Sequence, residues 1–466
     1  MLLLVGLCFA VLLYLSIAPA LFNDGDTSWH LAAGRWMIDT GSVPSVDPFS
    51  FTAAGQPWTA HEWLAEAIMA AMFRLGSWGA LSLLFATSVA ALLFILGLEA
   101  RRWLPSPLAL AALLLAVFIV LVPYIVARPH VLAWPLLASW TIALLRAREA
   151  RRAPPFAAAL LMLVWANLHA SFLFGLALIA PFALEALLES EERRPVVVRW
   201  GAFGLVSLLA ALATPHGVDG LLFPLQVSAM ASLPLIIEWR PTMLSENRGF
   251  EIVLIGTIAF ALYKGVKLPL IRLLLLAGIL YLAFEHVRHQ AVLAIVGALL
   301  LARPISEALG RERPEAPKLR SLGRGFAALG LAALVAMWAV RLAIPIARQD
   351  SRSNPVTAIA RVPAPLRAAP VLNAYGFGGP LILNGIRPYI DGRADMYGDA
   401  FVIEHRRMVD GDWRAFARAV ERWRIGWTIL PPGAGLVARL DRHPVWRRVY
   451  ADRWAVIHVA AARAGS

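Results

Sequence analysis

The sequence predicts a mostly α-helical, multi-pass membrane protein with a small α/β domain at its C-terminal end. Hydrophobic residues make up 59% of the 466 residues and charged residues only 16%, whereas a soluble protein carries roughly 25% charged residues. The apolar residues come in repeated runs of about 15–22, the length that crosses a bilayer. After about residue 346 these runs shorten, and Gly, Asp and Arg become frequent again.

About eleven helices are expected to span the membrane within a domain that covers residues 1–346, because helices satisfy their own backbone hydrogen bonds in lipid. The expected bounds are 2–21, 78–98, 106–126, 130–147, 155–169, 171–188, 198–214, 251–265, 268–285, 289–303 and 325–346. The first run lacks a basic start and is interpreted as an uncleaved signal-anchor helix.

Loop charges orient the chain. With the N-terminus in the cytoplasm, alternate loops on that side all contain Arg or Lys, as cytoplasmic loops do. These residues are Arg101-Arg102, Arg146 to Arg152, Arg193-Arg194, Lys264 with Lys267, and the stretch from Arg303 to Arg324. The outer face then receives residues 22–77, several polar turns, the C-terminal domain and most of the ten histidines.

Secondary structure is also expected in two regions on the outer face, the loop of residues 22–77 and the C-terminal domain. Amphipathic patterns predict interfacial helices at Thr27–Thr40 and at His61–Leu75 within the 22–77 loop. Residues 347–466 form the extracytoplasmic α/β domain. Strands are expected there at Val371–Asn373, Pro380–Leu383, Arg387–Asp391, Trp427–Leu430 and Trp454–Val459, and a helix at Trp413–Trp423.

Composition excludes some classes of function. The formal net charge is +13. Much of the Arg/Lys excess lies in short loops expected to face the cytoplasm, and no basic-aromatic module is visible, so a nucleic-acid partner is not expected. Cys8 is the single cysteine and lies inside the first apolar run. A disulfide framework and a cysteine-based metal site are therefore excluded.

Asp24, Asp26 and His30 are the candidate catalytic residues. Gly25 between the two carboxylates is expected to allow a sharp turn. The carboxylates can hold a hard divalent cation, Mg²⁺ or Mn²⁺, or one can deprotonate an acceptor hydroxyl as a general base. Capping of the following helix is the alternative, for which Asp24 is better placed. If that helix starts at Asp26, His30 lies one turn further on the same face.

Other polar residues cluster at the outer ends of the predicted spans. A guanidinium matches phosphate oxygens in a bidentate way, and ionisable groups at membrane depth often mark a site. The alternative role for each is an interfacial anchor or a helix-end cap. The candidates for binding a donor phosphate are Arg128, His130, His169, Arg288 and His289.

Three further segments are candidates for acceptor binding or loop structure. Glu62 and Glu66 share a helical face and need a partner, unless they form a solvated rim. Asp391 and Arg393 either bind an acceptor or form an Asp–Arg network that fixes a loop. The acceptor candidates are His61, Glu62, Asp391, Arg393 and Asp395. The segment Tyr375–Gly379 is interpreted as a tight turn between strands, and Glu238 with its neighbours has no assigned chemistry.

The first outer loop resembles that of a bacterial family of GT-C-type membrane glycosyltransferases. The superfamily includes oligosaccharyltransferases, protein mannosyltransferases and lipid A aminoarabinose transferases. The matching segments are Asp24 to Leu31, Gly34-Arg35-Trp36, Asp47 to Thr52 and His61 to Leu64, and the stretch from Tyr375 to Tyr397 is similar as well. The resemblance implies a role for Asp24 and Asp26 in acceptor activation or metal binding.

The resemblance also implies a function. The expected enzyme is a hexosyl or pentosyl transferase that moves a sugar from a polyprenyl-phosphate donor to a glycan, lipid or protein acceptor. It would act at the outer face of the bacterial cytoplasmic membrane, in synthesis of the cell envelope. The alternatives are a transporter or flippase of lipid-linked sugars, a polysaccharide polymerase or ligase of another fold, and a non-catalytic envelope scaffold. A flippase predicts charged residues deep within the spans, which the sequence does not show.

Overall fold

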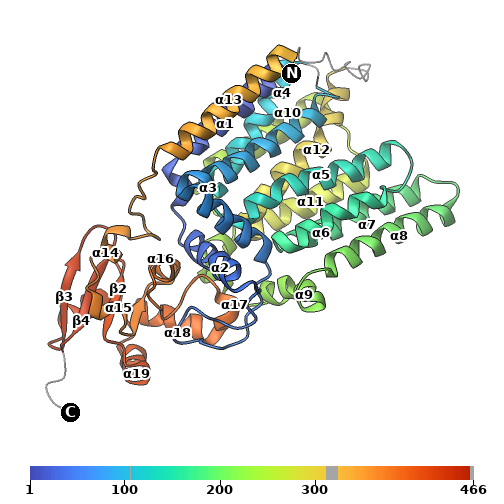
Figure 1. Cartoon of the computed structure of the whole chain (residues 1–466). Coiled ribbons are helices and arrows are strands. Elements are labelled where there is room, and N and C mark those ends of the chain that lie inside the picture. The colour runs from blue at the N-terminus through green and yellow to red at the C-terminus, as the bar shows by residue number, and fades with distance from the viewer. Residues whose placement is uncertain (105, 311–323, 462–466) are drawn as a thin grey trace.

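A helical bundle and a small sheet-containing domain make up the chain, and a computed structural model describes residues 1–104, 106–310 and 324–461 (Figure 1). Helices of the bundle are α1 (Leu2–Ile17), α3 (Trp63–Ala100), α4 (Pro107–Leu121), α5 (Pro129–Glu149), α6 (Ala159–Leu168), α7 (Phe172–Leu188), α8 (Arg193–Leu212), α9 (Gly217–Ser228), α10 (Arg248–Lys264), α11 (Leu270–Glu285), α12 (Gln290–Ala308) and α13 (Arg324–Ala343). The predicted basic linker residues Arg311, Arg313, Lys318 and Arg320 lie outside the described residues.

Each of the expected spans falls on a helix, so the multi-pass helical architecture is confirmed. Within the described ranges, five helices are long and apolar enough to cross a membrane, at Trp63–Ala100, Pro107–Tyr124, Pro129–Glu149, Arg193–Leu212 and Val287–Ala308. Shorter apolar helices lie at Leu2–Ile17, Phe156–Leu168, Phe172–Leu188 and Gly330–Ala343. The number of spans therefore stays a prediction.

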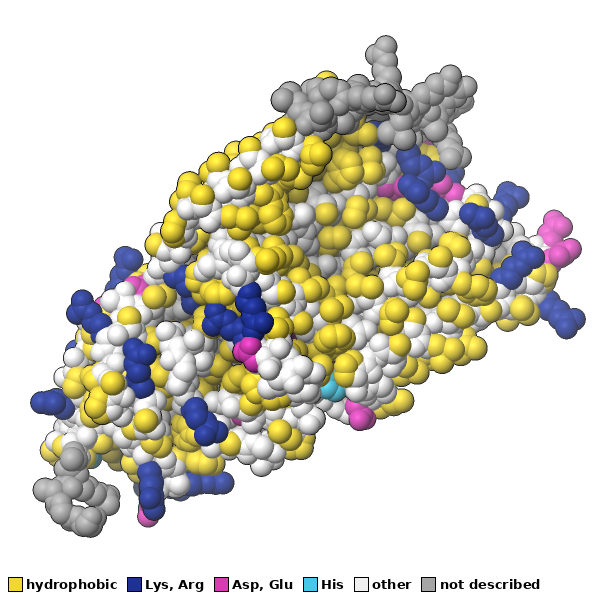
Figure 2. Space-filling model, in the orientation of Figure 1, with side chains coloured by type: hydrophobic (Ala, Val, Ile, Leu, Met, Phe, Trp, Pro, Cys, Tyr) yellow, Lys and Arg dark blue, Asp and Glu magenta, His cyan; other side chains and the backbone are white. Residues whose placement is uncertain are grey.

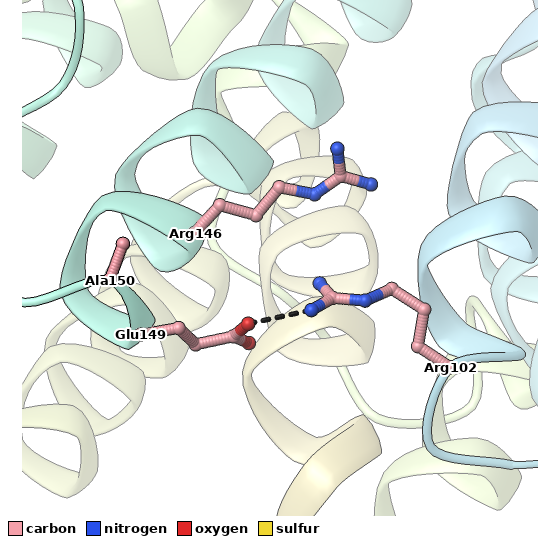
Figure 3. Close-up of a pocket in the computed structure, with 4 residues that line it drawn as sticks. All are labelled: Arg102, Arg146, Glu149 and Ala150. Atoms are coloured by element: carbon pink, nitrogen blue, oxygen red, sulfur yellow. Dashed lines mark hydrogen bonds and ion pairs between the residues drawn. The ribbon is translucent and has the colours of Figure 1, made fainter. Parts of the chain in front are cut away.

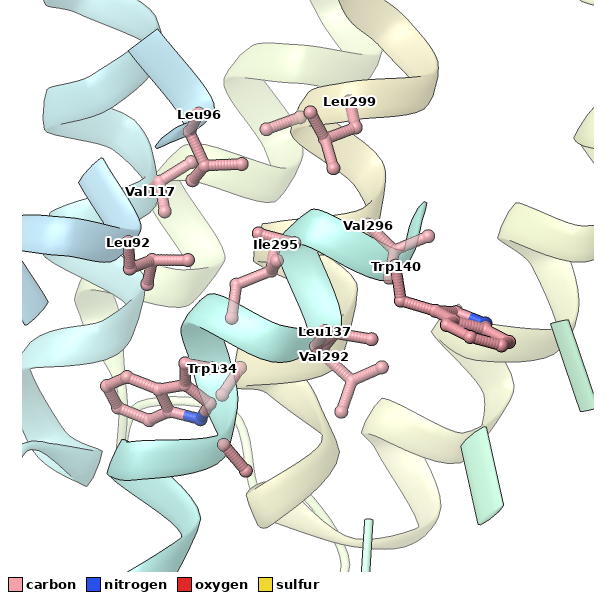
Figure 4. Close-up of a cluster of buried hydrophobic side chains, with 14 of the residues drawn as sticks. Leu92, Leu96, Val117, Trp134, Leu137, Trp140, Val292, Ile295, Val296 and Leu299 are labelled. Atoms are coloured by element: carbon pink, nitrogen blue, oxygen red, sulfur yellow. The ribbon is translucent and has the colours of Figure 1, made fainter. Parts of the chain in front are cut away.

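The centre of the bundle is a close-packed contact between α3, α5 and α12 (Figure 4). Leu92, Leu137 and Ile295 are buried there, one from each helix. Helices in lipid associate through close packing and hydrogen bonds, since lipid tails are as apolar as leucine. The indole of Trp140 meets both needs, because it is fully buried and its Nε1 donates to the Gly175 carbonyl at 2.8 Å.

Basic residues gather at one end of the bundle. Arg146 contacts Glu99 at 2.6 Å, and Arg102 pairs with Glu149 at 2.7 Å. A pocket here is lined by Arg102, Arg146, Glu149 and Ala150 (Figure 3). Arg101 contacts the Met1 sulfur at 3.5 Å, so the N-terminus lies at the same end. A broad hydrophobic surface separates this end from the C-terminal domain (Figure 2).

The first outer loop forms two helices, as predicted. Helix α2 (Asp26–Thr40) packs along the first part of α3. Helix α3 starts at Trp63 and breaks at Gly76 and Ser77, where Ser77 has a φ of 53°, so its outer part is separate from the spanning part. A Cβ at Gly34 would lie 1.9 Å from the Glu66 carbonyl oxygen. This close approach of α2 to α3 places His30 beside Glu66.

The C-terminal domain is built around a four-stranded sheet in the order β1-β2-β4-β3. The strands are β1 (Val371–Asn373), β2 (Trp427–Leu430), β3 (Trp446–Ala451) and β4 (Val456–Ala460), with β1 parallel to β2 and the other pairs antiparallel. Its helices are α14 (Val356–Ala360), α15 (Ala364–Arg367), α16 (Gly378–Leu383), α17 (Ala394–Tyr397), α18 (Asp399–Val409), α19 (Trp413–Trp423) and α20 (Gly435–Leu440).

Two of the predicted strands are wrong. Pro380–Leu383 belongs to α16, and a short apolar run does not distinguish a strand from a buried helix. Arg387–Asp391 forms no strand and joins no ladder. The Asn373 side chain replaces a neighbouring strand there, since it accepts from the Tyr389 N–H at 2.8 Å and donates to the Ile390 carbonyl at 2.7 Å.

Glycines let the C-terminal domain approach the start of α2 closely. A Cβ at Gly25 would lie 2.1 Å from the Gly376 carbonyl oxygen, and one at Gly379 would lie 2.2 Å from the Gly25 carbonyl oxygen. Gly25 itself has ordinary helical angles, φ −65° and ψ −31°. It is needed for close contact, and the sharp turn predicted from the sequence is absent. The segment Tyr375–Gly379 is likewise a docking surface at the start of α16, not a turn between strands.

Candidate active site

Asp24 and Asp26 lie together where α1 has ended and α2 begins. The Asp26 backbone N–H donates to Asp24 Oδ1 at 2.7 Å. The N-cap position of α2 is Gly25 and no side chain caps it, so neither aspartate is the N-cap that the sequence suggested. Asp26 occupies the first turn of α2, where its negative charge suits the helix N-terminus. Its side chain is 18% exposed, which leaves the carboxylate partly accessible.

Arg128 brings the two aspartates together with a third carboxylate. It precedes α5, and the backbone N–H of its neighbour Ala127 donates to the Leu21 carbonyl at 2.8 Å, which fixes the segment beside the end of α1. Its guanidinium lies 3.0 Å from Asp26 Oδ2 and 3.6 Å from Asp24 Oδ2, and it donates to both oxygens of Glu238 at 2.5 and 3.2 Å.

Arg288 extends this group on the other side of Glu238. Its Nη1 lies 3.9 Å from Glu238 Oε1, and its guanidinium stacks 4.4 Å from the centre of the Trp239 ring. Three carboxylates and two guanidinium groups from four distant segments thus form one network. All five side chains are between 18% and 30% exposed, so a ligand can reach them.

The network shifts the acidity of its members in opposite directions. Burial raises the pKa of Asp26, Arg128 lowers it, and the charges of Asp24 and Glu238 raise it again, to about 7. Burial also raises the pKa of Glu238, but Arg128 and Arg288 outweigh it and bring the value to about 2. Asp26 therefore exchanges a proton near neutral pH, whereas Glu238 stays ionised. Separated values of this kind are typical of a site with one base and one permanent charge.

A second polar cluster lies beside the first and is centred on Glu62. His30 Nε2 lies 3.7 Å from Glu62 Oε2, while His61 Nε2 and His169 Nε2 lie 3.7 and 3.4 Å from Glu62 Oε1. Glu66 Oε1 is 2.9 Å from His30 Nδ1. The partner predicted for the Glu62–Glu66 face is therefore His30. Within the described residues His30, Glu62 and Glu66 also form a group that could hold a metal ion.

Burial dominates the acidity of this cluster. It raises the pKa of Glu62 to about 7, partly offset by Arg128 and Arg288. Burial lowers the pKa of His61 to about 4, against the opposing charge of Asp395. Burial and then the positive charge of Arg128 hold the pKa of His30 well below its ordinary value. These histidines are therefore neutral at physiological pH.

Other predicted site residues flank the two clusters or lie further away; the ring centre of His130 is 6.1 Å from that of His169. His130 Nε2 is hydrogen-bonded to the Tyr124 carbonyl oxygen at 2.9 Å, and His289 Nδ1 to the Leu282 carbonyl oxygen at 3.1 Å. Asp391 and Arg393 are fully buried with Asp47, and Arg393 donates to the two carboxylates at 2.6–2.8 Å. This geometry favours the loop-fixing role for Arg393, since it ties the first outer loop to the C-terminal domain.

Sequence reasoning missed two residues of the site. Glu238 had no assigned chemistry, although it lies in a long outer loop next to a tryptophan and an arginine, which is a usable signal. Gly392 is the other. A Cβ there would lie 2.0 Å from Asp26 Oδ1, so the C-terminal domain covers the Asp26 carboxylate directly.

The fold is shared with membrane glycosyltransferases of known structure. ArnT from Cupriavidus metallidurans, solved with undecaprenyl phosphate, matches with a TM-score of 0.53 at 13% identity over 100% of this chain and 99% of that one. The archaeal oligosaccharyltransferase AglB from Archaeoglobus fulgidus, solved with an inhibitory peptide and a dolichol-phosphate, matches with a TM-score of 0.51 at 10% identity, over 92% and 69%.

A further structure of the Archaeoglobus fulgidus oligosaccharyltransferase, in complex with Zn and sulfate, matches with a TM-score of 0.52 at 10% identity, over 98% of this chain and 73% of that one. No protein-family model matches the sequence, and no curated protein does. At these identities the likeness concerns the fold, and the GT-C-type fold expected from the first outer loop is confirmed.

Proposed function

We propose that this chain is a GT-C-type glycosyltransferase that moves a sugar from a polyprenyl-phosphate carrier to an acceptor hydroxyl or amide at the outer membrane face. The observation that carries the proposal is the contact of Asp26 with Arg128 at that level, 3.0 Å apart and partly exposed. A base and a phosphate-binding guanidinium are the two groups that such a transfer needs side by side. The lipid phosphates bound to ArnT and AglB support this choice of donor.

Asp26 acts as the acceptor base in this proposal. Its carboxylate takes the proton of the acceptor while the acceptor atom forms a bond to the anomeric carbon of the sugar. The bond from that carbon to the phosphate oxygen breaks, and the lipid phosphate leaves with one additional negative charge. General-base catalysis of this kind contributes about 10²–10⁴-fold to a rate.

Arg128 and Arg288 stabilise the charge on the departing phosphate. Both guanidinium groups are held by Glu238, whose low pKa keeps it ionised and thus keeps the two arginines oriented. Fixed cations aimed at a developing charge are an efficient form of transition-state stabilisation. Arg128 offsets part of the negative charge of Asp24 and Asp26, and the proposed step is written without Mg²⁺ or Mn²⁺ at this pair.

Gly392 of the C-terminal domain covers one side of Asp26, so the acceptor reaches the carboxylate from the side that stays exposed. We place that domain on the extracytoplasmic side and the basic end of the bundle in the cytoplasm, in a bacterial cytoplasmic membrane. This orientation rests on the positive-inside rule.

Asp26→Asn is the direct test. The purified chain in lipid vesicles is given a radiolabelled polyprenyl-phosphate sugar and a range of acceptors, and the expected result is a loss of transfer of about 10²-fold or more. Asp39→Asn is the matched control, because Asp39 lies on the same helix with its carboxylate 66% exposed. Full transfer by Asp26→Asn would exclude Asp26 as the base.

A further inference from the structure

A single side chain, that of Gln290, joins three segments of the chain behind the candidate active site. Gln290 is the first residue of α12 and is fully buried. Its Oε1 accepts from the hydroxyl of Tyr124 at 2.6 Å and from Nδ2 of Asn247 at 2.8 Å. Its Nε2 donates to the hydroxyl oxygen of Thr242 at 2.9 Å. All the hydrogen-bonding groups of this amide, apart from one N–H, are thereby used between segments that are distant in the sequence.

Each of the three segments also carries one charged residue of the site. Arg128 follows Tyr124 by four positions. Glu238 precedes Thr242 by four positions, and Arg288 lies two positions before the glutamine itself. The two guanidinium groups and the carboxylate between them therefore have a common attachment point behind them, and the position of one relative to another depends on it.

The neighbours of Gln290 fix the orientation of its amide. Asn247 Oδ1 accepts from the Phe250 N–H at 3.2 Å and caps α10, so its Nδ2 is the atom that faces Gln290. Thr242 Oγ1 donates to the Ala283 carbonyl at 2.6 Å, so it is an acceptor towards Gln290. The place thus needs one accepting oxygen and one donating nitrogen, which a glutamine supplies and an ionised glutamate does not.

The bond from Tyr124 to Gln290 has no substitute. The loop between α9 and α10 is also attached to the turn before α12 by its backbone, since the Val287 N–H donates to the Arg240 carbonyl at 3.0 Å. Residues 122–128 lack such a backbone bond to either segment within the described ranges. Apart from the ion pairs of the site, the Tyr124 hydroxyl makes the one hydrogen bond that connects them there.

We propose that Gln290 is a positioning residue that holds Arg128 at a fixed distance from Arg288, so that both guanidinium groups meet one phosphate. The inference rests on the proposed function, in which this pair binds the lipid phosphate. The phosphate gains charge as it leaves, so its contacts with fixed cations strengthen in the transition state. Loss of Gln290 should therefore lower kcat and change KM little.

Gln290→Leu removes all three hydrogen bonds and keeps a side chain of similar length. Its kcat for transfer from the labelled lipid-phosphate sugar is expected to fall about 100-fold, the cost of a misplacement of about 1 Å. Thr141→Val is the matched control. It removes a fully buried hydroxyl that donates to the Leu137 carbonyl of the same helix at 2.8 Å, and it should transfer at the natural rate.

Coupling between Gln290 and Tyr124 distinguishes positioning from a general loss of stability. Tyr124→Phe keeps the ring and removes one neutral hydrogen bond, so kcat should fall about 5-fold. The double variant should be no slower than Gln290→Leu alone, because both changes break the same connection. Two losses that multiply in the double variant would overturn the proposal, as would a full kcat in Gln290→Leu or, if that variant does not fold, in Tyr124→Phe.

Binding of polyprenyl phosphate without a sugar separates this inference from the proposed function. The free lipid phosphate carries the charge that the leaving group gains, so Gln290→Leu should bind it about 10-fold more weakly, the equivalent of one hydrogen bond to a charged group. A natural chain that neither binds the lipid phosphate nor transfers a sugar would overturn both proposals. Binding and transfer by the natural chain, with unchanged binding by Gln290→Leu, would overturn the role of Gln290 alone.

Discussion

A single methyl group at Gly392 should move the Asp26 carboxylate. In Gly392→Ala the new Cβ would lie 2.0 Å from Asp26 Oδ1 and 2.7 Å from Trp29 Nε1. Non-bonded carbon contacts are favourable at about 3.5–4.0 Å, so the two segments must separate by more than about 1 Å. A misplacement of about 1 Å can cost about 100-fold in rate, which corresponds to about 2.7 kcal/mol of activation free energy.

The assay compares kcat for transfer from the labelled lipid-phosphate sugar in Gly392→Ala, in the natural chain and in Gly433→Ala. Gly433 lies in the same domain, and a Cβ there meets no atom within 4 Å, so this control should transfer at the natural rate. Thermal unfolding is recorded for each chain. A Gly392→Ala protein with unchanged kcat and unchanged unfolding temperature would refute the direct contact between the C-terminal domain and the catalytic carboxylate.

Four other outcomes are expected. Transfer should increase as the pH rises through about 7, because the base form of Asp26 is the carboxylate and its pKa is raised to about 7; a rate that falls over this range contradicts the assignment. The same raised pKa means that the stability contribution of Asp26 is greatest below its unfolded pKa of about 4 and is lost as the pH rises through 7. Arg393→Met leaves two buried carboxylates unpaired and should lower the free energy of unfolding by about 3–5 kcal/mol. The control Arg407→Met breaks an ion pair whose arginine is 63% exposed and should lower it by only about 0–1 kcal/mol. Equal unfolding temperatures for the two variants would contradict the loop-fixing role of Arg393. The orientation in the membrane is tested by cysteine labelling in intact cells, in a chain that lacks the native cysteine. Ser42→Cys should react with an impermeant thiol reagent, and Glu191→Cys should not. The reverse pattern would show that the proposed orientation is wrong.

The helices of the bundle were predictable because the bilayer imposes their length and because apolar runs of that length have few other uses. Segments such as 130–147 and 171–188 coincide with α5 and α7 within one or two residues. The C-terminal domain was less predictable. Its helix Trp413–Trp423 and its strand Trp427–Leu430 were found, but Pro380–Leu383 was assigned to a strand, because a short apolar run does not reveal its period.

Most of the candidate site was visible in the sequence. Asp24, Asp26 and Arg128 stood out because charged residues at the ends of apolar spans are costly. Glu238 did not, although it holds Arg128 more closely than either aspartate does. Its partner lies 110 positions away, and no local pattern records a contact of that range.

The sequence by itself determined the class of protein, the helices of the membrane domain and the outer loop that starts with Asp24 and Asp26. Those features follow from hydrophobic run length and from the chemistry of neighbouring residues, which are local properties. Only the tertiary structure decided that Arg128 pairs with both aspartates, that three histidines face Glu62 and that Gly392 lies against Asp26. Each of these contacts joins segments that lie far apart in the sequence and that only the fold brings together. The pKa of the Asp26 carboxylate depends on its contact with Arg128, which is one of them.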